Sequence, residues 1–161
     1  MNHKHRGMIL ETIINNTLDF YNQNNVAIMH KKMLDISFKK IGKDLTVKDA
    51  FVLKKSTVDY YGIYKGIFVA FEAKSTKENT LNLKQIQEHQ LNYLKKIRHH
   101  HGCAFLIIFF KEFERFFLLD IAKLDLNQKS ISLNFLEQNG IEVILTYPGI
   151  IDFADHIFDM L

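Results

Sequence analysis

The sequence predicts a mixed α/β domain, and three observations predict it. Two segments repeat their apolar residues at helical spacing, a glycine-bearing segment has the composition of a β-hairpin, and two further apolar runs have the length of strands. The chain of 161 residues is about the length of one domain and can bury a core. It has one proline and no linker, repeat or low-complexity tract, so a single domain over residues 1–161 is the simplest expectation.

The first predicted element is a helix over residues 7–21. Its residues at helical spacing are Leu10, Ile13, Ile14, Thr17 and Tyr21. Asn24 and Asn25 interrupt this pattern, and residues 26–30 then predict a short strand.

Residues 33–53 form the least regular part of the chain, and we interpret them as a partly helical arm that projects from the core. Residues 31–55 hold eight lysines against three aspartates, whereas residues 136–161 hold five acids and no lysine or arginine. A basic middle on a chain with an acidic end indicates a surface that faces a polyanion. A solvated lysine-rich loop agrees equally well with the composition alone.

Residues 56–74 predict two antiparallel strands in a hairpin, with Gly62 and Gly66 on either side of the turn. A helix is then expected over residues 83–101, ended by Gly102. The stripe of this helix that faces the core is Leu83, Ile86, Leu94 and Ile97. Residues 103–110 and 115–119 are predicted strands.

The cysteine and membrane signals favour a cytoplasmic protein. The single cysteine, Cys103, cannot form an internal disulfide and lies in an apolar run, so we expect a buried thiol in a reducing compartment. No segment reaches the roughly 18 apolar residues that a membrane span requires. Glu11, Asn15 and Asn16 interrupt any signal-peptide core.

The residues with the clearest chemistry lie on the predicted hairpin. Side chains alternate along a strand, so Glu72 and Lys74 share a face, roughly 7 Å apart at their Cα atoms. Thr57 and Asp59 follow the same rule on the partner strand. Two adjacent carboxylates repel each other unless a hard cation lies between them, and Mg²⁺ prefers such oxygen ligands. Lys74 would then face the reacting phosphate and offset the charge that grows in the transition state.

A Glu-x-Lys tripeptide is common, and taken alone it is better explained by ordinary cross-strand ion pairing. The surrounding residues favour a site. The opposite face of the strand is apolar, and the face of Glu72 also carries Phe68 and Ala70, so its charges need partners. Gln90 lies in the middle of the apolar stripe of the next helix. Either it caps a buried backbone group, or its carbonyl oxygen reaches a metal at the site.

The spacing from Asp59 to Glu72-Ala73-Lys74 resembles the active-site signature of the PD-(D/E)xK nuclease superfamily. The chain is more closely similar to one branch, the RecU Holliday-junction resolvases. The segments that carry this resemblance are His5-Arg6-Gly7, Leu10-Glu11, Ile28-Met-His-Lys-Lys32, Ser56-Thr-Val-Asp-Tyr-Tyr-Gly-Ile-Tyr-Lys-Gly66, Phe71-Glu-Ala-Lys74 and Glu88-His-Gln90. Val58 stands where the superfamily signature has proline, and the N-terminal arm is short.

The resemblance implies a restriction-endonuclease-like fold, a mixed sheet flanked by helices, with residues 33–53 as a projecting stalk. It implies Asp59 and Glu72 as metal-binding acids, Thr57 and Gln90 as further metal contacts, and Lys74 as the transition-state stabiliser. Glu11 resembles the first-helix acid of the superfamily. The implied cofactor is Mg²⁺, with Mn²⁺ as a substitute. The implied assembly is a homodimer, with Phe109, Phe110, Phe113, Phe116 and Phe117 in the core and the dimer interface.

The expected function is therefore a Mg²⁺-dependent endonuclease that resolves four-way junction DNA by paired nicks. Recombination proteins are further candidate partners, and no membrane is involved. A factor that binds branched DNA without cutting is the alternative, although such a protein has no need of two carboxylates facing a polyanion. The candidate DNA-binding residues are Arg6, Lys39, Lys40, Lys43, Lys48 and Phe51.

Overall fold

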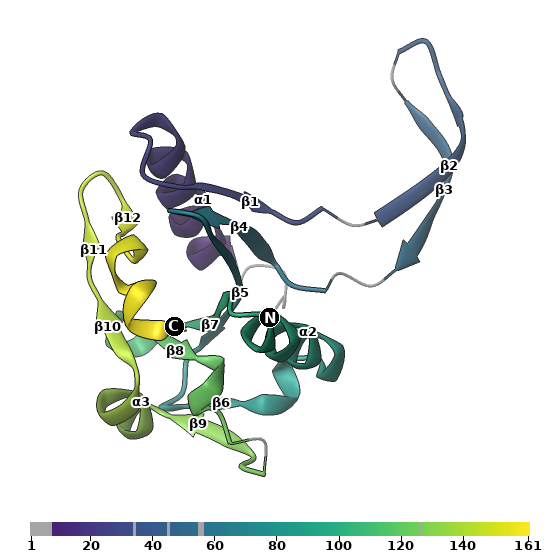
Figure 1. The fold of residues 1–161 in the computed structure, drawn as a ribbon. Helices are drawn as coiled ribbons and strands as arrows, with labels where there is room; N and C mark the ends of the chain where they lie inside the picture. Colours follow the sequence, from purple (N-terminus) through teal and green to yellow (C-terminus); the bar gives the residue numbers. More distant parts are fainter. Residues whose placement is uncertain (1–7, 34, 45, 55–56, 126) are drawn as a thin grey trace.

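A six-stranded mixed sheet lies at the centre of the computed structural model, which describes residues 8–33, 35–44, 46–54, 57–125 and 127–161 (Figure 1). In spatial order the strands are β1 (Ile28–Lys31), β4 (Tyr60–Tyr64), β5 (Ile67–Thr76), β7 (Cys103–Phe110), β8 (Arg115–Asp120) and β10 (Ile141–Val143). Neighbouring strands are antiparallel except β5 and β7. A parallel pair needs a crossover, which here contains α2 (Glu88–His99).

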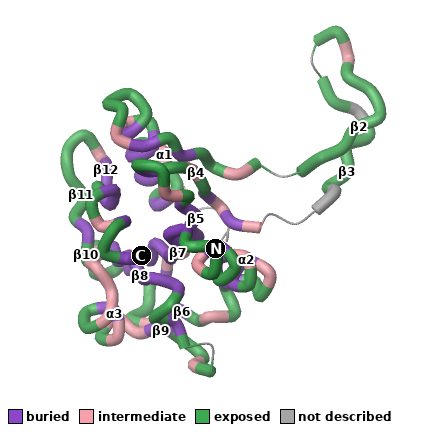
Figure 2. The backbone as a smooth tube through the Cα atoms, in the orientation of Figure 1, coloured by how far each residue is buried: buried purple, intermediate pink, exposed green. Residues whose placement is uncertain are grey.

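Helices cover both faces of this sheet, so its central strands are buried on both sides (Figure 2). Helix α1 (Met8–Gln23) and the C-terminal 3₁₀ turns (Ala154–His156 and Phe158–Met160) pack on one face. On the other face lie α2, α3 (Leu133–Asn139) and a small sheet of β6 (Thr80–Asn82) and β9 (Ser130–Ser132). The predicted mixed α/β class is confirmed, as are the helix near residues 7–21 and the strands at 103–110 and 115–119.

Alternation along β5 sends its side chains to two different cores. Val69 and Phe71 belong to the cluster under α1, whereas Ala70 belongs to the cluster under α2. Glu72 continues the series of Ala70 and therefore lies on the α2 side of the sheet, where it is fully buried. The pleat of one strand thus places an ionisable side chain inside the protein.

The predicted β4–β5 hairpin is confirmed, with two corrections. The turn is formed by Lys65 and Gly66, both at positive φ, whereas Gly62 lies within β4. A Cβ at Gly62 would approach the Cα of Met29 to 2.5 Å, so glycine is required there by the neighbouring strand. Thr57 and Asp59 lie in the loop before β4 and not on a strand.

The segment 33–53 projects from the body as expected, but the expectation of helix was wrong. It is a two-stranded hairpin of β2 (Asp35–Ile41) and β3 (Val47–Lys54), seen at the upper right of Figure 1. A tight turn joins the strands, because the amide of Gly42 donates to the carbonyl of Thr46 (2.8 Å) and the Thr46 hydroxyl to Asp44 Oδ1 (2.7 Å).

The helix predicted over residues 83–101 is shorter than expected. Residues Leu83–Gln85 form a separate 3₁₀ turn, since the Leu83 amide donates to the Lys129 carbonyl (3.0 Å), and α2 begins only at Glu88. At the other end His101, at φ 62°, adopts the left-handed conformation expected of Gly102. Gly102 is needed for space, because a Cβ there would lie 2.6 Å from Cγ2 of Ile97.

The remaining elements include a hairpin of β11 (Leu145–Thr146) and β12 (Ile150–Ile151) and the 3₁₀ turns Lys111–Phe113 and Ile121–Lys123. Cys103 is buried as predicted, and burial raises the pKa of its thiol to about 12, so it stays protonated at neutral pH. Of the five aromatic residues expected in the core and the dimer interface, four are buried and Phe113 is exposed. None of the helices in the described residues is long and apolar enough to cross a bilayer.

Candidate active site

Asp59 and Glu72 lie opposite each other where the chain enters β4. The backbone amide of Asp59 donates to Oε2 of Glu72 (3.1 Å), and the backbone amide of Ala73 donates to Oδ2 of Asp59 (3.3 Å). Each carboxylate is thus held by the main chain of the segment that carries the other. The structure brings these two predicted acids together even though Asp59 is not on a strand.

Glu72 receives two further donors from side chains. Its Oε1 accepts from Nζ of Lys74 (2.6 Å) and from Nε2 of Gln90 (2.6 Å). Burial and, second to it, the negative charge of Asp59 raise the pKa of Glu72 to about 7, against the opposing effect of Lys74. Both oxygens of the Glu72 carboxylate therefore accept hydrogen bonds, but the negative charge of Asp59 still repels it.

Gln90 combines the two roles that the sequence left open. Its Oε1 accepts from the backbone amide of Gln87 (2.9 Å) and so caps the start of α2, while its Nε2 faces Glu72. In this structure the amide nitrogen faces Glu72, whereas the carbonyl oxygen, which was expected to reach a metal, is held by the cap. The capping interaction explains this orientation, because it already occupies the oxygen.

Glu11 lies near the acids at the start of α1. It lines a cavity of about 210 Å³ together with Leu10, Lys31, Asp59, Tyr60, Ala73 and Ser75. Its carboxylate pairs with the ammonium of Lys31. Burial and then the charges of Glu11, Asp59 and Glu72 raise the pKa of the Tyr60 hydroxyl, so all three acids lie within electrostatic reach of that side chain.

Thr57 and two lysines complete the surroundings of the acids. The Thr57 hydroxyl accepts from Nζ of Lys32 (3.4 Å), and the amide of Lys32 donates to the carbonyl of Asp59 (2.7 Å). The Thr57 hydroxyl thus contacts a lysine that is itself hydrogen-bonded to the backbone of Asp59. We gave Lys31 and Lys32 no role from the sequence. They reach the site because β1 pairs with β4, which strand periodicity alone does not reveal.

The donor set fits a hard divalent cation. The described part of the chain contains no group of three or more His, Cys, Asp or Glu side chains placed to hold a metal. Mg²⁺ does not require one, since it commonly takes one or two carboxylates, waters and substrate phosphate oxygens. Burial and then the charge of Asp59 raise the pKa of Glu72, and a cation bound between the two acids would offset the second effect.

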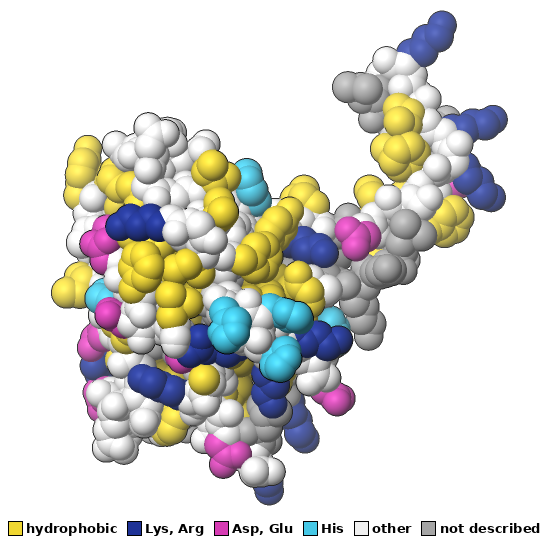
Figure 3. Space-filling view, in the orientation of Figure 1, with side chains coloured by type: hydrophobic (Ala, Val, Ile, Leu, Met, Phe, Trp, Pro, Cys, Tyr) yellow, Lys and Arg dark blue, Asp and Glu magenta, His cyan; other side chains and the backbone are white. Residues whose placement is uncertain are grey.

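The candidate DNA-binding residues do not converge on the acids. Lys39, Lys40, Lys43 and Phe51 are exposed on the β2–β3 hairpin, well away from the sheet (Figures 1 and 3). Nζ of Lys39 lies 5.8 Å from the centre of the Phe51 ring. The backbone of Lys48 belongs to β3, but its side chain and all of Arg6 lie outside the described residues.

Comparison with known proteins identifies similar sequences over nearly the whole chain. The model of the family "RecU: Recombination protein U" matches residues 5–159. The chain is 44% identical to a Holliday junction resolvase RecU of Mycoplasmopsis pulmonis, covering 98% of this chain and 97% of the relative. It is 36% identical to that of Ureaplasma parvum (99% and 96%) and 34% identical to that of Bacillus cereus (99% and 86%).

The fold is similar to that of a solved structure, Hjc of Archaeoglobus fulgidus, a Holliday junction resolvase. The TM-score is 0.53 at 14% sequence identity, covering 82% of this chain and 94% of the other. At this identity the likeness concerns the fold, and it confirms the restriction-endonuclease-like arrangement of a mixed sheet flanked by helices.

Proposed function

The chain belongs to the RecU family, and on that basis we propose that it is a structure-selective endonuclease that resolves Holliday junctions by paired nicks in DNA recombination and repair. The observation that carries this proposal is the buried carboxylate of Glu72, held between Lys74 and Gln90 and opposite Asp59. Two carboxylates repel a polyanion, so a protein that only binds DNA gains nothing from them.

The proposed cofactor is Mg²⁺, with Mn²⁺ as a substitute, held by Asp59 and Glu72. Bound there, a hard divalent cation polarises a phosphate oxygen and lowers the pKa of the attacking water. Thr57 and Gln90 are the further ligands that the family resemblance implies. Because the oxygen of Gln90 caps α2 in this structure, its ligation requires the amide to rotate and release the Gln87 amide.

The protein's own residues position the reaction. Lys74 lies beside Glu72 with its ammonium group available to the reacting phosphate, where it offsets the negative charge that grows in the transition state. The backbone amides of Asp59 and Ala73 orient the two carboxylates before any substrate binds. Glu11 is a candidate additional acid, kept near the site by its ion pair with Lys31.

We further propose that the protein acts as a homodimer, because paired nicks need two sites. Ile28, Ile63 and Phe68 are direct neighbours across β1, β4 and β5, and they expose 55%, 47% and 43% of their surface. Residues opposite each other on adjacent strands share a face, so they form one apolar patch. Contiguous exposed apolar residues of this kind mark protein interfaces, and a two-fold dimer uses the same patch on both subunits.

In such a dimer we propose that the β2–β3 hairpin enters the open centre of the four-way junction. Its projection from the body and the exposed cations Lys39, Lys40 and Lys43 support this role, since phosphates of four strands crowd together there. The exposed ring of Phe51 is placed to meet unstacked bases.

The test is cleavage of a synthetic four-way junction and of linear duplex with the same arm sequences, with and without Mg²⁺. We expect the wild-type protein to nick opposing junction strands only with the metal, and to leave the duplex largely intact. Asp59→Asn should bind the junction without cutting it. Tight junction binding without cleavage in Mg²⁺ or Mn²⁺ would favour the non-cleaving alternative, and equal cleavage of duplex would favour an ordinary duplex nuclease.

A further inference from the structure

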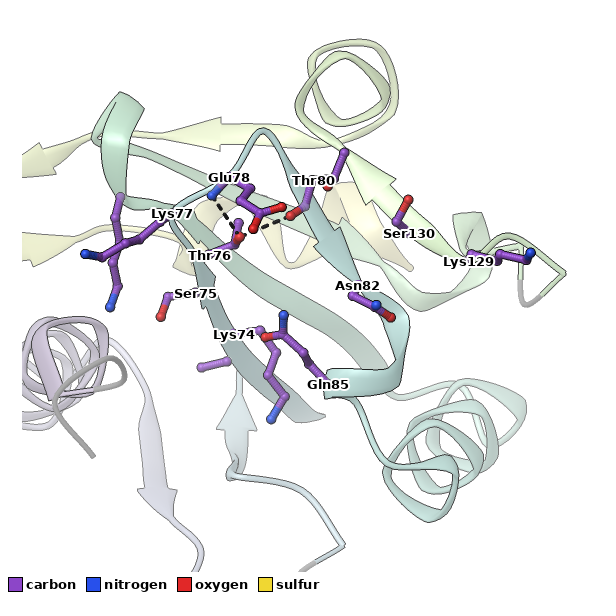
Figure 4. Close-up of a pocket in the computed structure, with 12 residues that line it drawn as sticks. Lys74, Ser75, Thr76, Lys77, Glu78, Thr80, Asn82, Gln85, Lys129 and Ser130 are labelled. Atoms are coloured by element: carbon purple, nitrogen blue, oxygen red, sulfur yellow. Dashed lines mark hydrogen bonds between the residues drawn. The ribbon is translucent and has the colours of Figure 1, made fainter. Parts of the chain in front are cut away.

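A second, larger groove begins where the acid site ends. It has a volume of about 940 Å³ and follows the C-terminal end of β5 towards β6 and β9 (Figure 4). Ala73 and Ser75 line both this groove and the smaller cavity beside Asp59 and Glu11. The two hollows therefore border the same stretch of β5, and Lys74 lines the larger one.

The lining of the groove is cationic and polar. Four lysines, Lys74, Lys77, Lys111 and Lys129, face one acid, Glu78, which leaves a formal charge of +3. The other lining residues are Ala73, Ser75, Thr76, Thr80, Asn82, Gln85 and Ser130. Among these described residues there is no aromatic ring on which a base could stack, while hydroxyl, amide and ammonium groups donate hydrogen bonds to phosphate oxygens. The lining of the groove therefore suits a phosphodiester backbone better than it suits bases.

Hydrogen bonds fix the backbone at two of these lysines, Lys77 and Lys129. The hydroxyl of Thr76 donates to the carbonyl of Thr80 (3.0 Å) and accepts from the amide of Glu78 (3.1 Å), which closes the turn that carries Lys77 (Figure 4). The carbonyl of Lys129 accepts from the amide of Leu83 (3.0 Å). Lys77 and Lys129 are exposed and lie towards opposite ends of the groove in Figure 4.

We propose that this groove binds the backbone of the cleaved DNA strand beside the scissile phosphate at Lys74, with Lys77 and Lys129 contacting two other phosphates towards opposite ends of the groove. The proposal rests on the nuclease function proposed above. It follows from the position of Lys74, which contacts Glu72 and also lines the groove, so a strand whose phosphate lies at Lys74 already lies in the cationic groove. The contact is to the backbone, so it adds affinity and alignment and not sequence preference.

The first test measures junction binding without divalent metal over a salt series, so that no cleavage occurs. Each phosphate contact that is lost should lower the magnitude of the slope of log K against log salt by about 0.9. The proposed dimer carries each substitution twice, so we expect a decrease of about 1.8 for Lys77→Ala and for Lys129→Ala, and roughly twice as much for the double variant. Lys65→Ala is the matched control, because Lys65 is also exposed but lies in the turn at the opposite end of β5.

The second test uses junctions in which a single phosphate near the cut is replaced by a neutral methylphosphonate. In the wild-type protein, a neutral linkage at a phosphate that Lys77 or Lys129 contacts should slow single-turnover cleavage by about tenfold, and in the double variant the same linkage should slow cleavage no further. Sensitivity that is equal in the two proteins, with unchanged salt slopes, would overturn the groove assignment. If the wild-type protein binds junctions but never cuts them, the proposed nuclease function fails. The salt slopes would still show whether the groove binds the DNA backbone.

Discussion

At the scale of single residues, Lys74 is expected to act on the transition state more than on binding. Its ammonium already lies 2.6 Å from Oε1 of Glu72, so its position does not depend on the substrate. Lys74→Ala should lower the single-turnover cleavage rate on the order of a hundredfold or more, with little change in junction affinity. If the loss appears only as weaker binding, and the rate at saturation is unchanged, Lys74 merely holds the phosphate.

Glu72 makes the stability of the metal-free protein depend on pH. Its folded-state pKa of about 7 is above the ordinary 4.5, so the folded protein holds this proton more tightly than the unfolded chain does. The resulting stabilisation is full below the ordinary pKa and is lost as the pH rises through the folded value. With metal removed, the unfolding free energy of the wild type should therefore fall between about pH 5 and pH 8 relative to Glu72→Gln, by as much as ~3 kcal/mol.

Denaturant titrations of the two proteins at each pH, with a chelator present, measure this difference directly. The amide of the Glu72→Gln variant cannot titrate, so its curve supplies the background from all other groups. Parallel stability curves for the two proteins would contradict the raised pKa.

At the scale of elements, the first turn of α2 couples helix stability to the site. Gln90→Ala removes the cap on the Gln87 amide and also one donor to Glu72. It should cost about 1–2 kcal/mol of stability and also slow cleavage. Gln87→Ala is the matched control, because it alters the same capping box without touching Glu72. Equal slowing by both variants would mean that Gln90 acts through the helix alone.

The β2–β3 hairpin is the element most exposed to a decisive test. Replacing Lys39, Lys40, Lys43 and Lys48 by Ala should weaken junction binding and flatten its salt dependence, while weak duplex binding changes little. The reason is geometric, since only a four-way junction has an open centre for the hairpin to enter. An equal loss on both substrates would show that the hairpin is a general cationic surface and that junction selectivity arises elsewhere.

At the scale of the whole molecule, assembly should depend on the apolar patch of Ile28, Ile63 and Phe68. A charge at its centre is costly to bury, so Phe68→Glu should convert a dimer to a monomer in light-scattering measurements. Phe113→Glu tests a competing surface, because Phe113 is equally exposed (45%) but follows the far end of β7. If only Phe113→Glu dissociates the dimer, the interface lies at that end of the sheet.

The sequence by itself determined the chemistry-bearing hairpin and the fold class. Asp59, Glu72 and Lys74 lie within 16 residues of one another, and strand alternation places Glu72 and Lys74 on one face wherever the hairpin goes. The buried strands and the first helix follow equally from local periodicity. The hairpin at 33–53 differs from the expectation because its sequence has no regular period. The start of α2 differs because a long-range contact with Lys129 separates residues 83–85 from the helix.

Only the tertiary structure decided how distant segments complete the site. Gln90 turns its nitrogen to Glu72 because its oxygen is already used by the helix cap, and Lys31 meets Glu11 because α1 packs against β1. The groove next to Lys74 exists because β9 pairs with β6, nearly 50 residues earlier in the chain. Periodicity predicts which face of its own strand or helix a side chain occupies. Which of these faces pack together depends on the tertiary fold, and that fold is set by the packing of both hydrophobic cores against the sheet.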